Sequence, residues 1–564
     1  MRACCKAVPG YFKTLQRARP SIGIHKSARA LHCKLQCMAP PTQLHELQLK
    51  DTEEELFSIL RETNKQAGLN TTLRCAGGWV RDKLLGKDSV DIDIALDNLL
   101  GTQFAEHLSA YLESKGQKAG RIAIVQANPE KSKHLETAKV RINELEVDLV
   151  NLRSETYVSD AAHRIPEMAF GTPEQDALRR DFTFNSMFYN INTGNVEDFT
   201  GKGKRDLADG IVRTPMQPQE TFMDDPLRVL RAVRFAARFG FQLEETLEHA
   251  AASQEVRQAL MKKVSRERVG QELDGMFNGP DPVRAMTDIH RLQLFPAVFT
   301  VTPDAAAKLP SSWGAPCVQL IADAKATLSA VTFQEELSKE EVKVALLSAL
   351  LLPLRALQSQ GKKGKTMPTV SLVIGDSMKW TKKYATIVQD IHTQAPELLT
   401  VSQTLQGLGS EWQNFAPEEL RTKLGLAVRQ LRSNWRLGAV AASLLPLSSA
   451  KPLGVDSAGA DAAESESYST SSTEVLAGRD DTNASEAARV ACCKWLESAV
   501  LAFKLDKCWK EAGFRPLLDG QQIKQATGAK GPEIGKITDE LVKWQLAHPD
   551  ATQQDAKAWL SRLG

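Results

Sequence analysis

The chain has 564 residues, of which 42% are hydrophobic and 25% charged, so it is long enough for three or four domains with cores of their own. Its formal net charge of +2 hides an asymmetry, because residues 1–37 contain eight Lys or Arg and no Asp or Glu, and the remaining 527 carry 63 basic and 69 acidic side chains. These numbers exclude a globally basic protein, so any contact with nucleic acid has to use a local basic surface.

The basic leader at 1–37, rich in Ser, Ala, Leu and Arg, resembles an organelle transit peptide, the alternative being a disordered tail. We expect the full-length form in a mitochondrion or plastid. Met38 opens a second possible start, whose product would stay in the cytoplasm and/or nucleus. No later segment has 18 consecutive apolar residues, so no membrane span is expected. The nine cysteines lack paired CxxC spacing, so we expect neither a zinc site nor a disulfide framework.

An amphipathic helix is expected over residues 51–66, followed by a strand over 71–76. This strand leads into Gly77-Gly78 and a short helix. Paired glycines followed by Arg81 suit a backbone turn that closes around phosphate oxygens. A Gly-x4-Gly-Lys-Ser/Thr sequence is missing, so this is not a Walker loop.

Two aspartates follow on the next expected strand. A period of two places Asp91 and Asp93 on one face, and Val90, Ile92 and Ile94 on the other. Neighbouring carboxylates repel unless a cation lies between them, and hard Mg²⁺ prefers carboxylate and phosphate oxygens. Either motif alone is more often an ordinary turn or a solvated strand end, but their order and spacing favour a nucleotidyl-transfer site with Asp91 and Asp93 as metal ligands. The arrangement resembles the nucleotidyltransferase superfamily that includes DNA polymerase beta.

A third carboxylate is expected from a neighbouring strand. Glu146 and Asp148 share one face of residues 144–150, and Asp148 is favoured because it lies in the more regular apolar alternation. It would orient or deprotonate an attacking hydroxyl, or complete a metal ligand set. The choice between the two carboxylates stays open. Residues 126–138 are polar and aperiodic, so we expect a mobile loop beside the site.

Helical periodicity begins near residue 174. Arg179 and Arg180 stand directly before Asp181-Phe182. Two adjacent guanidinium groups can bind triphosphate and ribose oxygens bidentately. Taken alone, the same sequence would more often be an ion pair on a helix surface.

One expected helix carries an arginine face. At about 100° per residue, its arginines fall within an arc of about 120°, and apolar residues occupy the opposite arc. The arginines are Arg228, Arg231, Arg234 and Arg238, and the apolar residues are Val229, Leu230, Val233, Ala236 and Ala237. The alternative is a solvated charged face.

Asp225 and Arg228 are three residues apart and therefore neighbours on this helix. An Asp acceptor beside an Arg donor can bind the Watson–Crick edge of cytosine or adenine, which both present an amino donor next to a ring-nitrogen acceptor. Uracil and guanine present the reverse order. The plainer interpretation of Asp225, before a proline, is a helix N-cap.

Together these blocks closely resemble class II tRNA nucleotidyltransferases, the CCA-adding enzymes, and the related bacterial-type poly(A) polymerases. The resemblance is densest over residues 70–275, and it departs at Asp224, where the family often has Glu. It implies an α+β fold, with a small mixed β-sheet nucleotidyltransferase head followed by all-helical neck, body and tail domains. It also implies nucleotide-binding roles for Gly78, Arg81, Arg180, Asp225, Arg228, Arg231 and Arg234, and the glycine pair and the adjacent arginines add Gly77 and Arg179 to this set.

The expected layout is a leader at 1–37, a head at 51–155, a neck at 156–275, a body at 276–445, a disordered insert at 446–487, and a tRNA-binding tail at 488–564. The expected reaction adds CTP twice and then ATP once to the 3′ end of tRNA, with Mg²⁺ as cofactor and without an obligate protein partner. A switch from C to A would involve the loop 126–138. The alternatives are a poly(A) polymerase, a CC-only or A-only enzyme, and a catalytically silent RNA-binding protein.

Overall fold

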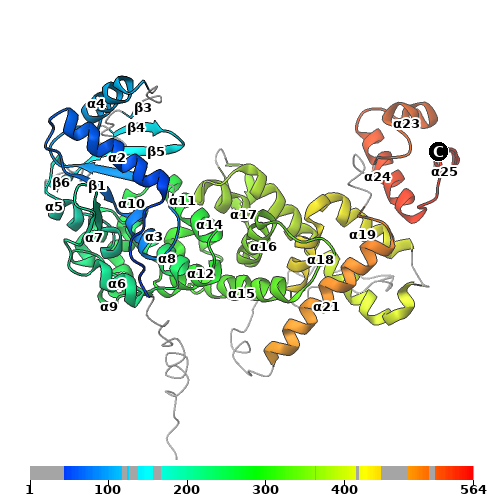
Figure 1. The fold of residues 1–564 in the computed structure, drawn as a ribbon. Coiled ribbons are helices and arrows are strands. Elements are labelled where there is room, and N and C mark those ends of the chain that lie inside the picture. Colours follow the sequence, from blue (N-terminus) through cyan, green and yellow to red (C-terminus); the bar gives the residue numbers. More distant parts are fainter. Residues whose placement is uncertain are drawn as a thin grey trace, which may run out of the picture.

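The computed structural model describes residues 43–89, 91–116, 123–125, 137–156, 167–361, 364–413, 418–445, 481–506 and 515–562. The chain forms an elongated, curved molecule with the β-sheet at one end and the C-terminal helices at the other (Figure 1). The leader 1–37, Met38 and residues 126–136 of the expected loop lie outside the described residues.

The sheet at the N-terminal end contains seven strands in the order β3-β4-β5-β2-β1-β8-β9. β2 and β5 pair in parallel and the other neighbours pair antiparallel, so the sheet is mixed, as predicted. The strands are β1 (Leu73–Ala76), β2 (Ile92–Leu96), β3 (Ala123–Val125), β4 (Thr137–Ile142), β5 (Leu145–Asn151), β8 (Phe188–Asn190) and β9 (Asn195–Glu197).

The alternation along β2 decides which face of the sheet is covered. Ile92 and Ile94 are buried in a core built with α2 (Asp51–Gln66) and α4 (Gly101–Ser114). Asp93 points to the opposite face, because successive side chains of a strand alternate. The open face of the sheet therefore carries the carboxylates, and the amphipathic helix expected over 51–66 covers its back.

The neck follows from residue 173 and is mostly helical. Its helices are α5 (Pro173–Leu178), α6 (Gly203–Asp209), α7 (Pro218–Asp224), α8 (Leu227–Phe239), α9 (Glu245–Ala251), α10 (Gln254–Lys263), α11 (Arg266–Phe277) and α12 (Pro282–Arg291). A short parallel pair links β10 (Ile211–Val212) to β11 (Gln242–Leu243), and β6 (Arg153–Thr156) pairs with β7 (Glu167–Phe170). The five apolar residues predicted on the inner arc of α8 are all buried.

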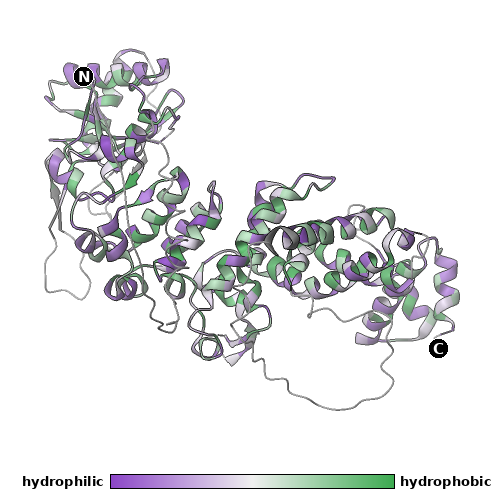
Figure 2. Ribbon diagram, turned by 90° about the horizontal axis from the view of Figure 1, so that it is seen from below, coloured by the Kyte–Doolittle hydropathy of each residue, from purple (hydrophilic) through white to green (hydrophobic). Residues whose placement is uncertain are grey.

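The body is a bundle of helices continuous with the neck core. It contains α13 (Phe295–Val298), α14 (Pro303–Ala306), α15 (Gly314–Ala330), α16 (Lys339–Leu351), α17 (Thr369–Leu372), a π-helix (Val373–Ser377), α18 (Lys382–Leu408), α19 (Glu418–Leu431), α20 (Trp435–Ser443) and α21 (Asp481–Ala502), with a hairpin of β12 (Gln358–Gln360) and β13 (Thr366–Pro368). Figure 2 shows hydrophobic and hydrophilic residues alternating along these helices. This pattern fits helices that are buried on one side.

The C-terminal helices α23 (Gly520–Thr527), α24 (Pro532–Ala547) and α25 (Gln553–Leu560) enclose a small core of their own. Leu546 of α24 contacts the body at Gly425 of α19, where a Cβ atom would stand only 2.5 Å from its side chain. Arg421 also donates a hydrogen bond to the Leu546 carbonyl at 2.7 Å. These contacts join the tail to the body at α19. No helix of the described residues is long and apolar enough to cross a membrane.

The element boundaries differ from the expected layout in three places. β8 and β9 extend the head sheet to Glu197, beyond residue 155, because three-residue strands leave no readable alternation. Thr137 and Ala138, expected in the loop, begin β4. α21 starts at Asp481 inside the expected insert and packs on α18 and α20, so part of the expected tail joins the body.

Candidate active site

The glycine pair forms a tight turn between β1 and α3 (Gly78–Leu84). Gly77 has φ +66°, a conformation that disfavours side chains, and a Cβ there would stand 2.8 Å from Nη1 of Arg180. Gly78 has ordinary space, since its Cβ would stand 3.6 Å from Arg81. Gly77 is therefore required both by its backbone angle and by the arginine that lies over the turn.

The carboxylates lie on neighbouring strands of the open face. The parallel register of β2 and β5 pairs Asp93 directly with Asp148. Asp91 is exposed and immediately precedes β2. Burial raises the pKa of the Asp93 carboxyl, Arg180 lowers it, and the charges of Asp148 and Asp91 raise it again, leaving it above its usual value. Asp93, Asp148 and Asp91 therefore interact electrostatically with Arg180 and Lys139 at this point.

Asp148 and Glu146 occupy different positions on β5. Asp148 accepts a hydrogen bond from Nζ of Lys139 on β4 at 2.8 Å, and this bond raises the pKa of Lys139. Glu146 lies opposite Arg141, one step further along the same face and away from Asp93. The register therefore places Asp148, and not Glu146, directly beside Asp93.

The donor set suits a divalent cation shared with a ligand. Among the described residues, no three His, Cys, Asp or Glu side chains assemble into a complete metal-binding group. Asp91 and Asp93 would supply hard carboxylate oxygens, and phosphate oxygens of a nucleotide would complete the shell. The pKa of Asp93 is raised first by burial and then by the charges of Asp148 and Asp91, and a cation bound between these carboxylates would offset the charge contribution.

Asp176 of α5 organises both arginines of the Arg179-Arg180 pair. Its carboxylate is 1% exposed and accepts from Nε of Arg179 at 2.8 Å and from Nε and Nη2 of Arg180 at 3.0 and 2.8 Å. Burial alone would raise the pKa of Asp176, but Arg180 and Arg179 outweigh it and hold the pKa below its usual value. The Arg180 guanidinium also stacks over Phe188, 5.1 Å from the ring centre. Arg180 is therefore held over the glycine turn and close to Asp93.

Arg81 occupies a different place from the one its motif suggests. It is 5% exposed, and it donates to both oxygens of Asp82 at 2.8 and 2.9 Å and to Oδ1 of Asn185 at 2.6 Å. Its guanidinium lies 5.3 Å from the ring centre of Phe235 and 5.0 Å from that of Phe239, both on α8. In this structure Arg81 joins the head to α8 from the interior.

Asp225 and Arg228 stand at the start of α8, and each is held by another element. Oδ1 of Asp225 accepts from the Leu227 amide at 3.2 Å across Pro226, which is the N-cap residue of α8, and Oδ2 accepts from Arg268 of α11 at 2.7 Å. Nη2 of Arg228 donates to the Arg179 carbonyl at 2.6 Å. The two predicted base-reading side chains are thus fixed between α11 on one side and the Arg179-Arg180 segment on the other.

The arginine face of α8 is packed against protein over much of its length. Arg231 bonds Asp181 at 2.8 Å and approaches Glu272 at 3.5 Å, and Arg234 bonds Glu272 at 2.6 Å. Phe235 lies on the same arc and is buried, with both guanidinium groups over its ring. Burial would raise the pKa of Asp181, but Arg231 and Asn185 hold it below its usual value. Arg231 and Arg234 therefore fix the helix in place.

Several supporting residues were missing from the sequence-based set. Asp176 had a readable signal, because it stands three and four residues before the two arginines on one helix. The others bond to elements far away in sequence, so spacing alone could not pair them with their partners. They are Asp181, Asn185, Arg268 and Glu272. For Arg268 and Glu272, the family resemblance of residues 267–272 implied that this block braces the base-reading helix, and both residues contact it or the residue before it.

The mixed sheet, the glycine turn before the first carboxylate strand, and the Asp93–Asp148 register define a nucleotidyltransferase of the polymerase-beta type. The family described as "Poly A polymerase head domain" matches residues 73–213, and "Probable RNA and SrmB- binding site of polymerase A" matches residues 240–309.

Relatives that match over most of their length identify the family more narrowly than these two family models do. The chain is 30% identical to the CCA tRNA nucleotidyltransferase, mitochondrial, of Candida glabrata, over 93% of this chain and 97% of that protein. It is 34% identical to the protein of the same name from Saccharomyces cerevisiae, over 86% of both. The chain belongs to the CCA tRNA nucleotidyltransferase family, which confirms the predicted resemblance.

Solved structures agree on the fold. An apo CCA-adding enzyme aligns with a TM-score of 0.56 at 18% identity, over 92% of this chain and 97% of that one. The Thermotoga maritima CCA-adding enzyme complexed with tRNA aligns with a TM-score of 0.51 at 18% identity, over 92% and 99%. Poly(A) polymerase I of Escherichia coli matches only 37% of this chain and 42% of its own length, at 34% identity. The predicted α+β architecture is confirmed.

Proposed function

We propose that this enzyme adds C, C and A in turn to the 3′ end of tRNA, using CTP twice and ATP once, without a nucleic-acid template. The observation that carries the proposal is the register of Asp93 with Asp148, beside Arg180 and the Gly77 turn. This arrangement supplies what a nucleotidyl transfer needs at one place, namely carboxylates for cations and a fixed guanidinium for phosphate.

In each cycle the 3′ oxygen of the RNA forms a bond to the α-phosphorus of the nucleotide, and the bond from that phosphorus to the pyrophosphate oxygen breaks. Asp91 and Asp93 would hold Mg²⁺, which supplies Lewis-acid activation of the hydroxyl and charge stabilisation of the leaving group. Asp148 orients the attacking hydroxyl. Arg180 and Arg179 bind the triphosphate, and Asp176 keeps both in position.

Base choice rests on Asp225 and Arg228. The carboxylate accepts from the exocyclic amino group of cytosine or adenine, and the guanidinium donates to the adjacent ring nitrogen. Uracil and guanine would place a carbonyl against the carboxylate and an N–H against the guanidinium, which leaves both pairs unsatisfied. Arg231 and Arg234 hold α8 in position. The loop 126–138 is the proposed element for the change from C to A, and replacing it with a short linker should leave products that end at CC.

A second candidate, poly(A) polymerase, is favoured by the name of the head family and by the partial Escherichia coli match. It would use ATP alone. The relatives named mitochondrial favour a mitochondrial location for the full-length form. A cytoplasmic or nuclear form from Met38 is a separate proposal, which expression from each start followed by localisation would test.

The test supplies a tRNA lacking its 3′ CCA with Mg²⁺ and all four nucleotides, and sequences the product ends. We expect CCA ends from the wild type and no extension from Asp91→Ala. A long A tract would support the poly(A) polymerase instead, and absence of any extension by the wild type would leave only an RNA-binding protein.

A further inference from the structure

Outside the leader the chain carries more acidic than basic side chains, so a tRNA substrate needs a local basic surface. Two short segments stand out. Residues 261–268 and 376–383 together contain seven Lys or Arg and two acidic residues. The first spans the turn from α10 to α11, and the second leads into α18.

These two segments lie side by side. Nε of Arg266 donates to the Ser377 carbonyl at 2.7 Å, and Nζ of Lys379 lies 3.5 Å from the carboxylate of Glu267. The Trp380 indole donates to the Gly270 carbonyl at 3.1 Å. Three separate contacts therefore join the start of α11 to the stretch before α18.

The joined segments begin at the base-reading residues. Arg268 bonds Asp225, and Nζ of Lys263 donates to the Met223 carbonyl, two residues before Asp225. From there the exposed lysines continue toward the body. They form what we call the basic strip, which consists of Lys262, Lys263, Lys379, Lys382 and Lys383.

Three of its members occupy positions that cost stability. Lys379 has φ +57°, a left-handed conformation that glycine adopts freely and lysine does not. Lys382 and Lys383 are the first two residues of α18, where positive charge opposes the helix dipole and no acidic residue compensates in the first turn. These costs do not identify a ligand by themselves, since Arg432 and Lys504 also have positive φ, but the clustering of exposed lysines beside Asp225 on an otherwise acidic chain fits the binding of anions.

We propose that the basic strip binds phosphate groups of the tRNA backbone next to the 3′ end. The inference rests on the proposed function, because it takes tRNA as the substrate. Lysine is a flexible point charge that suits phosphate contacts without reading sequence, so the strip would position the RNA while Asp225 and Arg228 select the base. An acidic protein partner would also complement the charge of the strip. It would not explain why the strip begins beside the base-reading residues, whereas the RNA 3′ end has to reach them.

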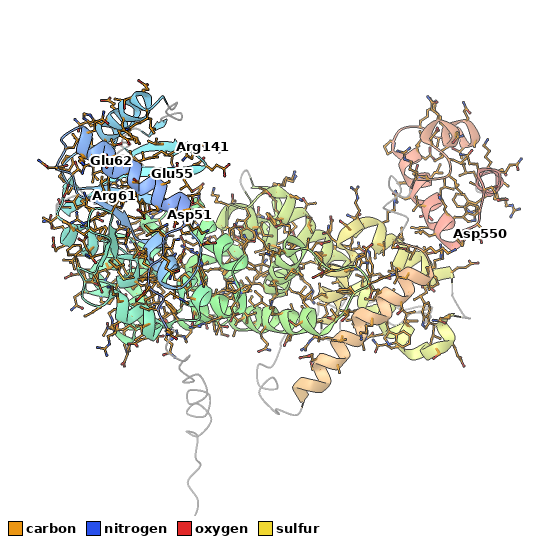
Figure 3. All side chains as sticks on the ribbon, in the orientation of Figure 1. Asp51, Glu55, Arg61, Glu62, Arg141 and Asp550 are labelled. Carbon is orange, nitrogen blue, oxygen red and sulfur yellow. The ribbon has the colours of Figure 1, made fainter. Side chains whose placement is uncertain are left out.

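The test uses the full chain with Lys379→Gly, and separately with Lys382→Gln and Lys383→Gln combined. Lys65→Gln serves as the control, because Lys65 is exposed on α2, on the back of the sheet where the outer helix surface carries charged side chains such as Glu55 and Glu62 (Figure 3). The dissociation constant for a tRNA transcript lacking CCA would be measured across a series of salt concentrations, together with the affinity for CTP and the melting temperature.

Each lysine removed from the strip should weaken tRNA binding about five- to ten-fold at 0.1 M salt and reduce the slope of log K against log salt by about 0.7 to 0.9. CTP affinity, kcat at saturating tRNA and the control should not change. Lys379→Gly should melt at the same temperature or higher, so weaker tRNA binding by it cannot be ascribed to unfolding.

Wild-type affinity and salt slope in both strip variants would overturn the proposal, even where the wild type adds CCA. Failure of the wild type to add CCA would instead refute the proposed function.

Discussion

Asp176→Asn tests how the active-site arginines are held. The change keeps the size of the side chain and removes the charge from a carboxylate that is 1% exposed and binds both Arg179 and Arg180. Breaking a buried ion pair costs about 3–5 kcal/mol, and the two arginines are 23% and 21% exposed, so we expect about 3 kcal/mol, near the lower end. Arg180 would also lose its fixed position, and the KM for CTP should rise about ten-fold or more.

The effect on stability should depend on pH. Because the pKa of Asp176 is lowered in the folded protein, its charge stabilises the fold above the unfolded value of about 3.9, and this contribution is lost as the pH falls through the folded pKa. The difference in free energy of unfolding between the wild type and Asp176→Asn should therefore be full at pH 7 and shrink below about pH 4.

Urea denaturation at several pH values and steady-state kinetics with CTP would measure both effects. Glu174→Gln is the matched control, because Glu174 is exposed on the same helix. If Asp176→Asn matches the control in stability and in KM at pH 7, Asp176 does not hold the arginine pair in position.

Three further changes follow from the structure. Asp93→Ala should lower kcat by about a hundred-fold or more with little change in melting temperature. Single-turnover kinetics would measure this loss, and a loss of less than about ten-fold would contradict a metal-binding role for Asp93. Arg228→Ala should reduce the preference for CTP over UTP in kcat/KM by about ten-fold or more, and an unchanged ratio would argue against its base-reading role. Gly270→Ala would place a Cβ 1.9 Å from the Met378 carbonyl and should cost about 3 kcal/mol in thermal melts, whereas Gly407→Ala, with no atom within 4 Å, should be neutral or stabilising.

Local periodicity was sufficient to predict the parts of the site that lie within one element. The alternation around Asp93 predicted its face, and the 100° pattern predicted the buried side of α8. The pairing of Asp93 with Asp148 is a matter of register between strands more than fifty residues apart. Period alone could not choose between Asp148 and Glu146, because both lie on the same face.

Spacing along the sequence could not predict which groups the arginines bind or whether they are buried. Arg81 follows the glycine pair as a phosphate ligand would, but Asp82, Asn185 and the rings of α8 enclose it. The arginine face of α8 has the pattern of a solvated surface, yet Asp181 and Glu272 pair with it. Asp82 is next to Arg81 on α3, but the other partners come from other elements, so only the three-dimensional structure shows that these arginines are enclosed.

The most direct measurement supplies nucleotides one at a time to a tRNA that lacks its 3′ CCA. With CTP alone, we expect two added residues and then a stop, and with ATP supplied afterwards, one residue more. UTP and GTP should not be added. Continued addition of A residues with ATP alone, or addition of C without a stop at two, would contradict ordered CCA addition by this enzyme.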